Sequence, residues 1–256
     1  MQIVFIFLAA LAAFLPLTPA AASPQRIVSI GLCTDQLLLL LADREQIASL
    51  SGWAADPDMS YMIDSVGDIP LNDSSVEEVI AYRPDLVLSS RFAAWNSARF
   101  LRRLGYEVRQ VPAVKSIADI YHLLRQVGAW TGHPERAERI VGEMQRKLDE
   151  IARRYRDRPR KTVLVYSPNG FTVGADTLEN DIFVHAGYRN LAAEMGIEGF
   201  RRIALETLLA ADPDVLQIDR DLSRPDSLAT AYLGHPVLDR FGAQREKLDI
   251  PTRLRI

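Results

Sequence analysis

The sequence predicts an α/β protein with two Rossmann-like lobes, each with a central, mostly parallel sheet, joined by one long α-helix. Short β-branched runs alternate with helical patterns on both sides of the middle of the chain, and this alternation is typical of parallel sheets. The middle carries an amphipathic pattern long enough to lie across both halves. A further pattern occurs once in each half, which indicates two related lobes.

The first half of the chain alternates strands with helices. Its first strand, RIVSI, leads into a loop expected at residues 31–35. A later helix begins after two serines that can cap it and ends before Pro84. The strands are expected at residues 26–30, 46–50, 86–88 and 107–111. The helices are expected at residues 36–42, 76–81 and 97–104.

The middle of the chain predicts two consecutive helices. The first covers residues 117–130 and ends at Gly132, and the second begins at Pro134, since proline suits the first helical position. Apolar residues recur in the second helix at positions 137, 140, 141, 144, 148, 151, 152 and 155. This spacing continues for about six turns, or roughly 33–35 Å, so the helix is long enough to join two lobes.

The second half repeats the same alternation. A strand is expected at residues 161–166, a loop rich in Gly, Pro and Asn at 167–175, and a helix at 178–186. Residues 76–88 and 205–217 share the pattern apolar-Glu-x-apolar-apolar-Ala-x-x-Pro-Asp-apolar-apolar. Joints of this kind are common in α/β proteins, but the shared Glu favours an internal duplication.

The position of the repeat divides the chain. Glu206 lies 129 positions after Glu77, and Pro213 lies 129 positions after Pro84. We assign residues 1–22 to a signal peptide, 23–115 to an N-terminal lobe, 116–158 to connecting helices and 159–256 to a C-terminal lobe. The cleft between the lobes is then the expected ligand site.

The first residues indicate export. An apolar run at residues 3–17 precedes Ala20 and Ala22, which suit a signal-peptidase site with Ser23 as the mature start. The run is shorter than the roughly 20 residues that span a bilayer, and a buried N-terminal strand or helix is the alternative. No cysteine follows the run to carry a lipid. We therefore expect secretion through the Sec pathway into the periplasm.

The composition argues against nucleic-acid and membrane-surface binding and against an intrachain disulfide. The net charge of −3 favours neither nucleic acid nor an anionic membrane surface. Cys33 is the only cysteine of the sequence, so an intrachain disulfide cannot form.

Several short motifs, in their order, resemble the cobalamin- and ferric-siderophore-type periplasmic binding proteins, whose lobes are linked by one rigid helix. The resemblance covers residues 24–254. The motifs are RIVSIGLCTDQL at residues 26–37, VGD at 66–68, SVE at 75–77, PDLVL at 84–88, the linking helix, and Glu206 with PDVL at 213–216.

The resemblance implies a solute-binding component of an ABC importer. Its ligand would be cobalamin, a ferric siderophore or haem, so the iron or cobalt would belong to the ligand and the protein would need no cofactor. One Glu on each lobe would dock onto arginines of the permease dimer in the inner membrane, and these acids correspond to Glu77 and Glu206. The alternative is that both simply stabilise helix N-termini. We expect a monomer without nucleic-acid partners.

The end of the sequence departs from the family pattern. Family members finish with a strand, a loop and a closing helix, whereas this sequence stops at residue 256, just after that strand is expected to begin. We therefore expect the C-terminal lobe to lack the closing helix.

Candidate ligand-binding residues follow from the rule that ligands sit beyond the carboxyl ends of the strands in open α/β sheets. Aromatic side chains there can supply apolar faces, and arginines can pair with carboxylates or phosphates. Cys33 is interpreted as loop packing, since cysteine is often a small buried residue. The candidates are Cys33, Thr34, Asp35, Trp53, Arg91, Phe92, Trp95, Asn169, Phe171, Phe200, Arg201, Arg202 and Asp219.

Other functions have weaker support. A bare-metal site needs three or four converging ligands, but the histidines of the sequence show no such spacing. Haem ligation would draw on Tyr61. A periplasmic enzyme could use Asp35 with Asp176 or Asp219 with Asp221, but no known catalytic motif accompanies either pair. A binding protein outside transport also stays open.

Overall fold

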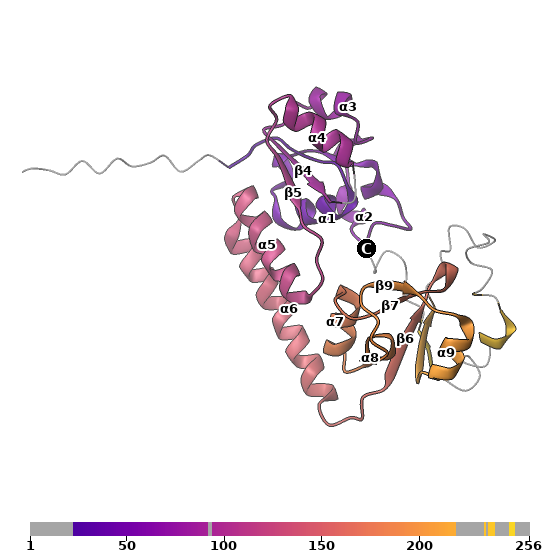
Figure 1. Cartoon of the computed structure of the whole chain (residues 1–256). Coiled ribbons are helices and arrows are strands. Elements are labelled where there is room, and N and C mark those ends of the chain that lie inside the picture. The colour runs from indigo at the N-terminus through magenta and orange to yellow at the C-terminus, as the bar shows by residue number, and fades with distance from the viewer. Residues whose placement is uncertain (1–22, 92–93, 219–232, 234, 239–245, 249–256) are drawn as a thin grey trace, which may run out of the picture.

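The computed structural model describes residues 23–91, 94–218, 233, 235–238 and 246–248. Two α/β lobes lie one above the other beside a long helix, α6 (Pro134–Tyr155), which runs along one side of the molecule (Figure 1). The predicted fold class is therefore confirmed. Among the described residues, none of the helices is both long and apolar enough to span a membrane.

The N-terminal lobe is built on a parallel sheet with the strand order β3-β2-β1-β4-β5. Its strands are β1 (Ile27–Ser29), β2 (Ile47–Ser51), β3 (Leu71–Asn72), β4 (Leu86–Ser90) and β5 (Val108–Val111). Its helices are α1 (Leu32–Leu41), α2 (Ile63–Val66), α3 (Val76–Ala81) and α4 (Trp95–Arg103). Because the strands are parallel, their carboxyl ends share the edge that faces the other lobe (Figure 1).

Alternate residues of the central strands enter two different cores. Ile27 and Leu88 pack on the side of α1 and the long helix, whereas Val28 and Val87 pack on the side of α3 and α4. This alternation follows from the two-residue period of a strand. Apolar side chains therefore cover both faces of the sheet, as expected for parallel strands.

Two helices form the hairpin that links the lobes. α5 (Ile117–Thr131) begins at Ser116, whose side chain accepts a hydrogen bond from the backbone of Asp119. Gly132 ends it with a φ of 84°, a left-handed conformation that favours glycine. The chain then turns directly into α6, and the prediction of one long helix between the lobes is confirmed.

The C-terminal lobe has a second parallel sheet, with the order β11-β10-β6-β8. Its strands are β6 (Thr162–Tyr166), β8 (Arg189–Asn190), β10 (Val215–Ile218) and β11 (Glu246–Leu248). Two further strands, β7 (Phe171–Val173) and β9 (Phe200–Arg202), pair antiparallel beside it. The helices are α7 (Leu178–His185), α8 (Leu191–Glu194) and α9 (Leu205–Ala211), with a 3-10 turn η5 (Pro236–Leu238).

The repeated Pro-Asp pair has the same structural role in both lobes. The Asp85 carboxylate accepts hydrogen bonds from the backbone of Gln25 at 2.7 Å and Arg26 at 3.1 Å, just before β1. The Asp214 carboxylate accepts one from the backbone of Thr162 at 2.8 Å, at the start of β6. Each Asp lies just before one strand, β4 or β10, and its carboxylate holds the start of the neighbouring first strand of the lobe, β1 or β6. The strand series β1-β4-β5 and β6-β10-β11 therefore correspond.

Three predicted local structures are wrong. The loop at residues 31–35 is the first turn of α1, because the Gly31 carbonyl accepts hydrogen bonds from the backbone of Thr34 and Asp35 at 3.0 Å each. The helix predicted from residue 97 already begins at Trp95. The loop at 167–175 contains β7, whose partner β9 lies about thirty residues further along the chain, beyond the reach of a local pattern. The segments 1–22 and 249–256, which carry the predictions about both ends, lie outside the described residues.

Two contacts join the start of the linking hairpin to the C-terminal lobe. The Asp181 carboxylate at the start of α7 accepts a hydrogen bond from the Ile117 backbone N–H at 2.8 Å. Lys115, in the connection before α5, forms an ion pair with Asp176, in the connection before α7. The start of the linking hairpin is therefore held against the C-terminal lobe.

Candidate functional site

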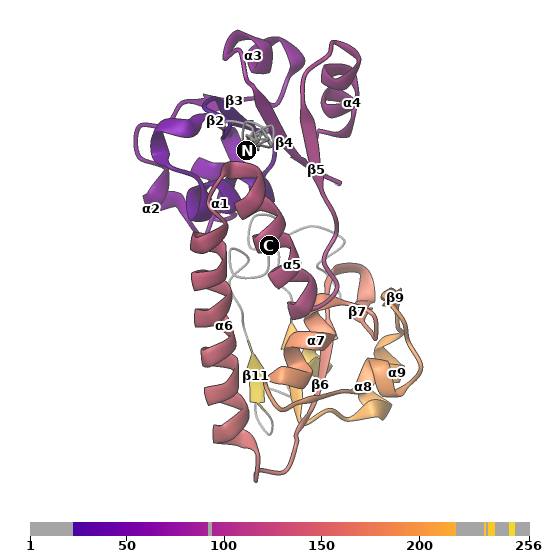
Figure 2. The same cartoon turned by 90° about the vertical axis from the view of Figure 1, so that its left-hand side faces the viewer.

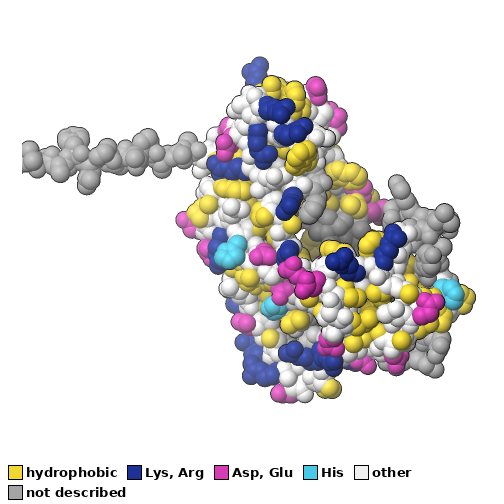
Figure 3. All heavy atoms as spheres, in the orientation of Figure 1, with side chains coloured by type: hydrophobic (Ala, Val, Ile, Leu, Met, Phe, Trp, Pro, Cys, Tyr) yellow, Lys and Arg dark blue, Asp and Glu magenta, His cyan; other side chains and the backbone are white. Residues whose placement is uncertain are grey.

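The carboxyl ends of the two sheets face each other across a hollow between the lobes. Figure 1 places the start of α1 on the lower edge of the N-terminal lobe, and β7 with β9 on the opposing edge of the C-terminal lobe. The space-filling view shows the hollow, with Lys and Arg side chains at its rim (Figure 3). The topology therefore brings the predicted ligand-binding segments of both lobes to one place.

Exposed aromatic side chains lie on the N-terminal side of the site. Trp53 sits in a 3-10 turn, η2 (Gly52–Ala55), directly after β2 and is 55% exposed. Trp95 begins α4 and is 54% exposed, and the Arg99 guanidinium lies 4.9 Å from the centre of its ring. Large exposed rings after parallel strands are suited to stack on a flat ligand. Arg99 was not among the predicted residues, although its position one helical turn after Trp95 indicated it.

Two candidates in the first segment do not reach the surface. Thr34 and Asp35 are fully buried in α1. Their predicted direct contact with a ligand is therefore not available in this structure. The Thr34 hydroxyl donates to the Gly31 carbonyl at 2.8 Å, and the Asp35 carboxylate accepts a hydrogen bond from the Ser51 backbone at 2.9 Å. Thr34 therefore ties the first turn of α1 to the loop after β1, and Asp35 ties it to the end of β2, just before the turn that carries Trp53.

The Asp35 carboxyl is a buried acid for which the described residues supply no basic partner. Desolvation raises its pKa from 3.8 to about 6, against the opposing effect of hydrogen bonds from Ser29 and Ser51. Burial also raises the pKa of the neighbouring Cys33 thiol, and the Asp35 charge adds to this effect. Cys33 is nevertheless exposed, so its interpretation as a buried packing residue is wrong: it lies on the outer face of the first turn of α1.

The C-terminal side of the site is the β7–β9 ribbon. Phe171 pairs with Arg202 across the two strands, and the guanidinium lies 4.9 Å from the centre of the ring. Phe200 is 59% exposed, and Arg201 is exposed beside it. Asn169 is exposed in the preceding turn with a φ of 60°, a left-handed conformation that asparagine tolerates. The predicted arginines and aromatic rings of this lobe thus lie together on one strand pair. The sequence predicted these residues but not the strand pair that brings them together.

Of the three remaining candidates, the structure describes one. Arg91 is exposed directly after β4. Phe92 and Asp219 lie outside the described residues.

The two glutamates of the repeat lie in matching places on the lobes. Glu77 and Glu206 are both exposed in the first turns of α3 and α9. Glu77 borders a hollow of about 350 Å³ that Ser97 and Phe100 of α4 also line. Phe100 is 52% exposed, so the N-terminal docking candidate combines a carboxylate with an apolar ring.

Among the described residues, the geometry assembles neither a metal site nor the Asp35–Asp176 pair, and Asp219 and Asp221 lie outside the described residues. No group of three or more His, Cys, Asp or Glu side chains among the described residues is placed to hold a metal ion. Asp35 is bonded to Ser51, whereas Asp176 pairs with Lys115, so these two acids do not form a catalytic pair. Tyr61, the candidate haem ligand, is 63% exposed before α2.

Comparisons with known proteins agree with this geometry. A family described as periplasmic binding protein matches residues 27–240. A cobalamin-binding protein of Halobacterium salinarum is 27% identical over 216 residues, which cover 82% of this chain and 58% of that protein. The chain thus matches little more than half the length of this relative. A vitamin B12-binding protein of Pectobacterium carotovorum is 25% identical over 232 residues, covering 88% of this chain and 80% of that protein.

The fold also matches solved structures. A periplasmic haem-binding protein of Roseiflexus sp. RS-1, solved without its ligand, superposes with a TM-score of 0.71 at 22% identity. The superposition covers 88% of each chain.

Proposed function

Because the chain belongs to the periplasmic binding protein family, we propose that it is the solute-binding component of an ABC importer and holds a metal chelate between its lobes. The observation that carries the proposal is the opposition of exposed rings on the N-terminal lobe, Trp53 and Trp95, to the arginine and phenylalanine ribbon of β7 and β9. A bulky, flat ligand with acidic or polar substituents complements both surfaces. Export into the periplasm through the leader at residues 1–22 is part of the proposal.

Cobalamin is the chelate that we propose first. The two relatives named for cobalamin or vitamin B12 match most of this chain. A corrin ring offers apolar faces to the tryptophans, and its amide and phosphate groups can accept hydrogen bonds from the β9 arginines. Ferric siderophores, like cobalamin, are rigid complexes that carry oxygen acceptors for hydrogen bonds. They therefore belong to the same proposal.

Haem is the second candidate, and exposed Tyr61 is the observation that favours it. Phenolate oxygen is an accepted axial ligand for haem iron. The tyrosine lies two residues before the start of α2. If haem is the ligand, Tyr61→Phe would shift the absorption spectrum of the bound iron, whereas cobalamin binding would be unaffected.

Direct binding to the purified full chain tests the proposal. Aquocobalamin, a ferric hydroxamate, a ferric catecholate and haem would each be titrated while tryptophan fluorescence is recorded. We expect one of them to quench the fluorescence with a saturating isotherm and to raise Tm with the logarithm of its concentration above Kd. Failure of all four to bind folded protein would contradict the proposal.

Delivery to a permease is the second part of the proposal, and Glu77 with Glu206 would make the contact. Two exposed carboxylates in corresponding places on the lobes suit two matching basic sites on a permease dimer. Such contacts set the register and the association rate more than the affinity.

A further inference from the structure

The long helix extends well past the helix that it packs against. α5 has 15 residues and α6 has 22, and the two form an antiparallel hairpin around Gly132. The last turns of α6, about two of them, therefore run beyond the start of α5. Figure 2 shows α5 beside the upper part of α6, while the lower part extends past the start of α5 along the C-terminal lobe.

An apolar stripe continues along this extension. Met144, Leu148, Ile151 and Tyr155 follow one another at spacings of four, three and four residues, the spacing of a helix–helix seam. Met144 packs against the core of the N-terminal lobe. Ile151 is 38% exposed and Tyr155 is 39% exposed. The seam that α5 covers at one end is thus only partly covered at the other, where the Arg158 guanidinium lies 5.1 Å from the centre of the Tyr155 ring.

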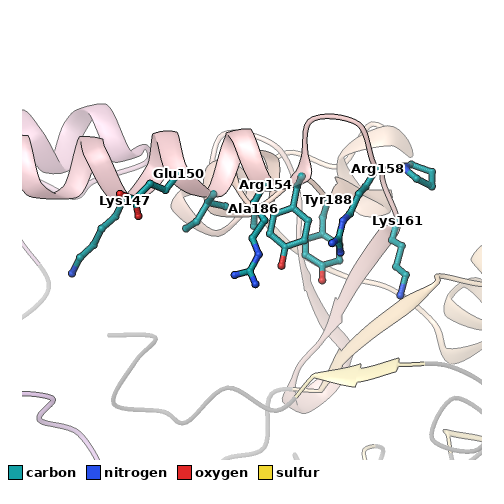
Figure 4. Close-up of a pocket in the computed structure, with 11 residues that line it drawn as sticks. Lys147, Glu150, Arg154, Arg158, Lys161, Ala186 and Tyr188 are labelled. Carbon is teal, nitrogen blue, oxygen red and sulfur yellow. The ribbon is translucent and has the colours of Figure 1, made fainter.

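The open part of the seam borders a cavity of about 680 Å³. One wall is α6, and the other walls are the connection from α6 to β6 and the turn after α7. Figure 4 shows the side chains of Arg154, Arg158 and Tyr188 pointing into the same space. The cavity is lined by Lys147, Glu150, Ile151, Arg154, Tyr155, Arg158, Pro159, Lys161, Ala186, Gly187 and Tyr188.

The lining of this groove is strongly basic. It carries Lys147, Arg154, Arg158 and Lys161 against a single acid, Glu150. Within the described part of the chain, no carboxylate pairs with the first three of these cations. The negative end of the helix dipole can account for Arg154 in the last turn, but the dipole acts only within that turn and does not explain Lys147. Like charges on one side of a groove are complementary to an acidic partner.

We propose that this groove binds an amphipathic helix of a partner protein, with an apolar stripe on Ile151 and Tyr155 and acidic residues flanking it. A helix is the occupant that continues the α5–α6 seam, since its side chains can interdigitate with the same three–four spacing. The length of the groove along α6, from Lys147 to Tyr155, is roughly 12 Å, or about two helical turns of contact.

The proposed site is separate from the candidate permease contact. α9, which carries Glu206, lies on the opposite side of the C-terminal lobe from the end of α6 (Figure 1). A partner in the groove and a permease on Glu206 can therefore bind at the same time. The inference does not depend on which chelate the cleft holds.

A fluorescently labelled peptide tests the inference on the full chain. The probe is a synthetic peptide of about four turns with Leu at heptad positions a and d and Glu at e and g. We expect its anisotropy to rise on binding, and Arg154→Glu combined with Arg158→Glu to weaken binding at least about tenfold. A second peptide with Lys in place of Glu should prefer this double variant. Tyr155→Ser should weaken the first peptide without reversing the charge preference.

Arg153→Glu is the matched control, because Arg153 is exposed on the same helix but does not line the groove. It should bind the acidic peptide like the unmodified chain. Three results would overturn the inference. One is that a scrambled peptide of the same composition binds equally well. Another is that Arg153→Glu weakens binding as much as the double variant. The third is that sedimentation shows a dimer for the unmodified chain and a monomer for the double variant, because the occupant of the groove would then be a second copy of this chain.

Discussion

Trp53→Ala tests the candidate ligand site most directly, because the ring is about half exposed. A tryptophan side chain buries up to about 250 Å² when fully covered, and 55% of Trp53 is exposed in this structure. A ligand that covers this area would gain about 3 kcal/mol at 25 cal/mol per Å². The variant should therefore weaken binding by up to about a hundredfold.

The remaining part of the ring contributes to folding. Its loss would reduce the free energy of unfolding by about 2–3 kcal/mol, which lowers Tm by roughly 5–10 °C in a chain of this size. The protein should still be folded at 25 °C. Isothermal titration calorimetry with the chelate that binds the unmodified chain gives Kd, and thermal unfolding gives Tm. Trp130, near the end of α5 in the linking hairpin, packs against the core of the N-terminal lobe, so Trp130→Phe should leave Kd unchanged.

Two results would refute this reasoning. If Kd changes by less than twofold while the variant stays folded, Trp53 does not contact the ligand. If the variant is unfolded at 25 °C, the ring belongs to the core, and the exposed fraction does not describe its role.

Three other predictions follow from the same structure. Glu77→Arg with Glu206→Arg should leave chelate affinity within twofold of the unmodified chain but abolish import in cells, and equal loss of both would contradict the docking assignment. Asp85→Ala should lower the free energy of unfolding by about 1–2 kcal/mol, because it leaves the backbone N–H groups of Gln25 and Arg26 without their carboxylate. Urea unfolding measures this loss, and a loss under about 0.3 kcal/mol would contradict the prediction. The Asp35 carboxyl has a pKa of about 6 in the folded chain and 3.8 in the unfolded chain, so the folded chain binds this proton more tightly. The resulting contribution to the free energy of unfolding is complete below pH 4. It falls by about 3 kcal/mol as the pH rises through 6. Asp35→Asn should remove that slope from thermal unfolding measured between pH 4 and 7, and an unchanged slope would contradict the burial argument.

The overall fold could be predicted because its signals are periodic and local. Buried parallel strands such as β1 and β4 are continuous β-branched or leucine-rich runs, and the two helices of the hairpin are long enough for their apolar spacing to be unambiguous. The repeated Glu and Pro-Asp pattern also has a physical cause that only the structure displays. Asp85 and Asp214 each bind the backbone at the start of the first strand of their lobe, so the pattern marks a fixed joint of the fold.

The site was predicted less well because its residues depend on tertiary contacts. β7 and β9 are three residues each and pair across a long connection, so neither has a periodic signal of its own. Asp35 and Cys33 are two residues apart, yet one is buried and the other exposed. The start of α1 decides this difference, and Gly31 gives no conventional capping side chain by which a sequence pattern could locate that start.

The contacts between the lobes also bear on how a ligand is captured. The first residue of α5, Ile117, donates a backbone hydrogen bond to the Asp181 carboxylate in the first turn of α7. The ion pair of Lys115 with Asp176 is exposed on both sides and adds little free energy by itself, but both contacts lie where the chain passes from β5 to the C-terminal lobe. A large hinge motion would break the backbone hydrogen bond at the start of α5 and leave a helix N-terminus less well satisfied. We therefore expect these contacts to oppose a reorientation of the C-terminal lobe relative to the hairpin by about the 1.5–3 kcal/mol of a hydrogen bond to a charged group.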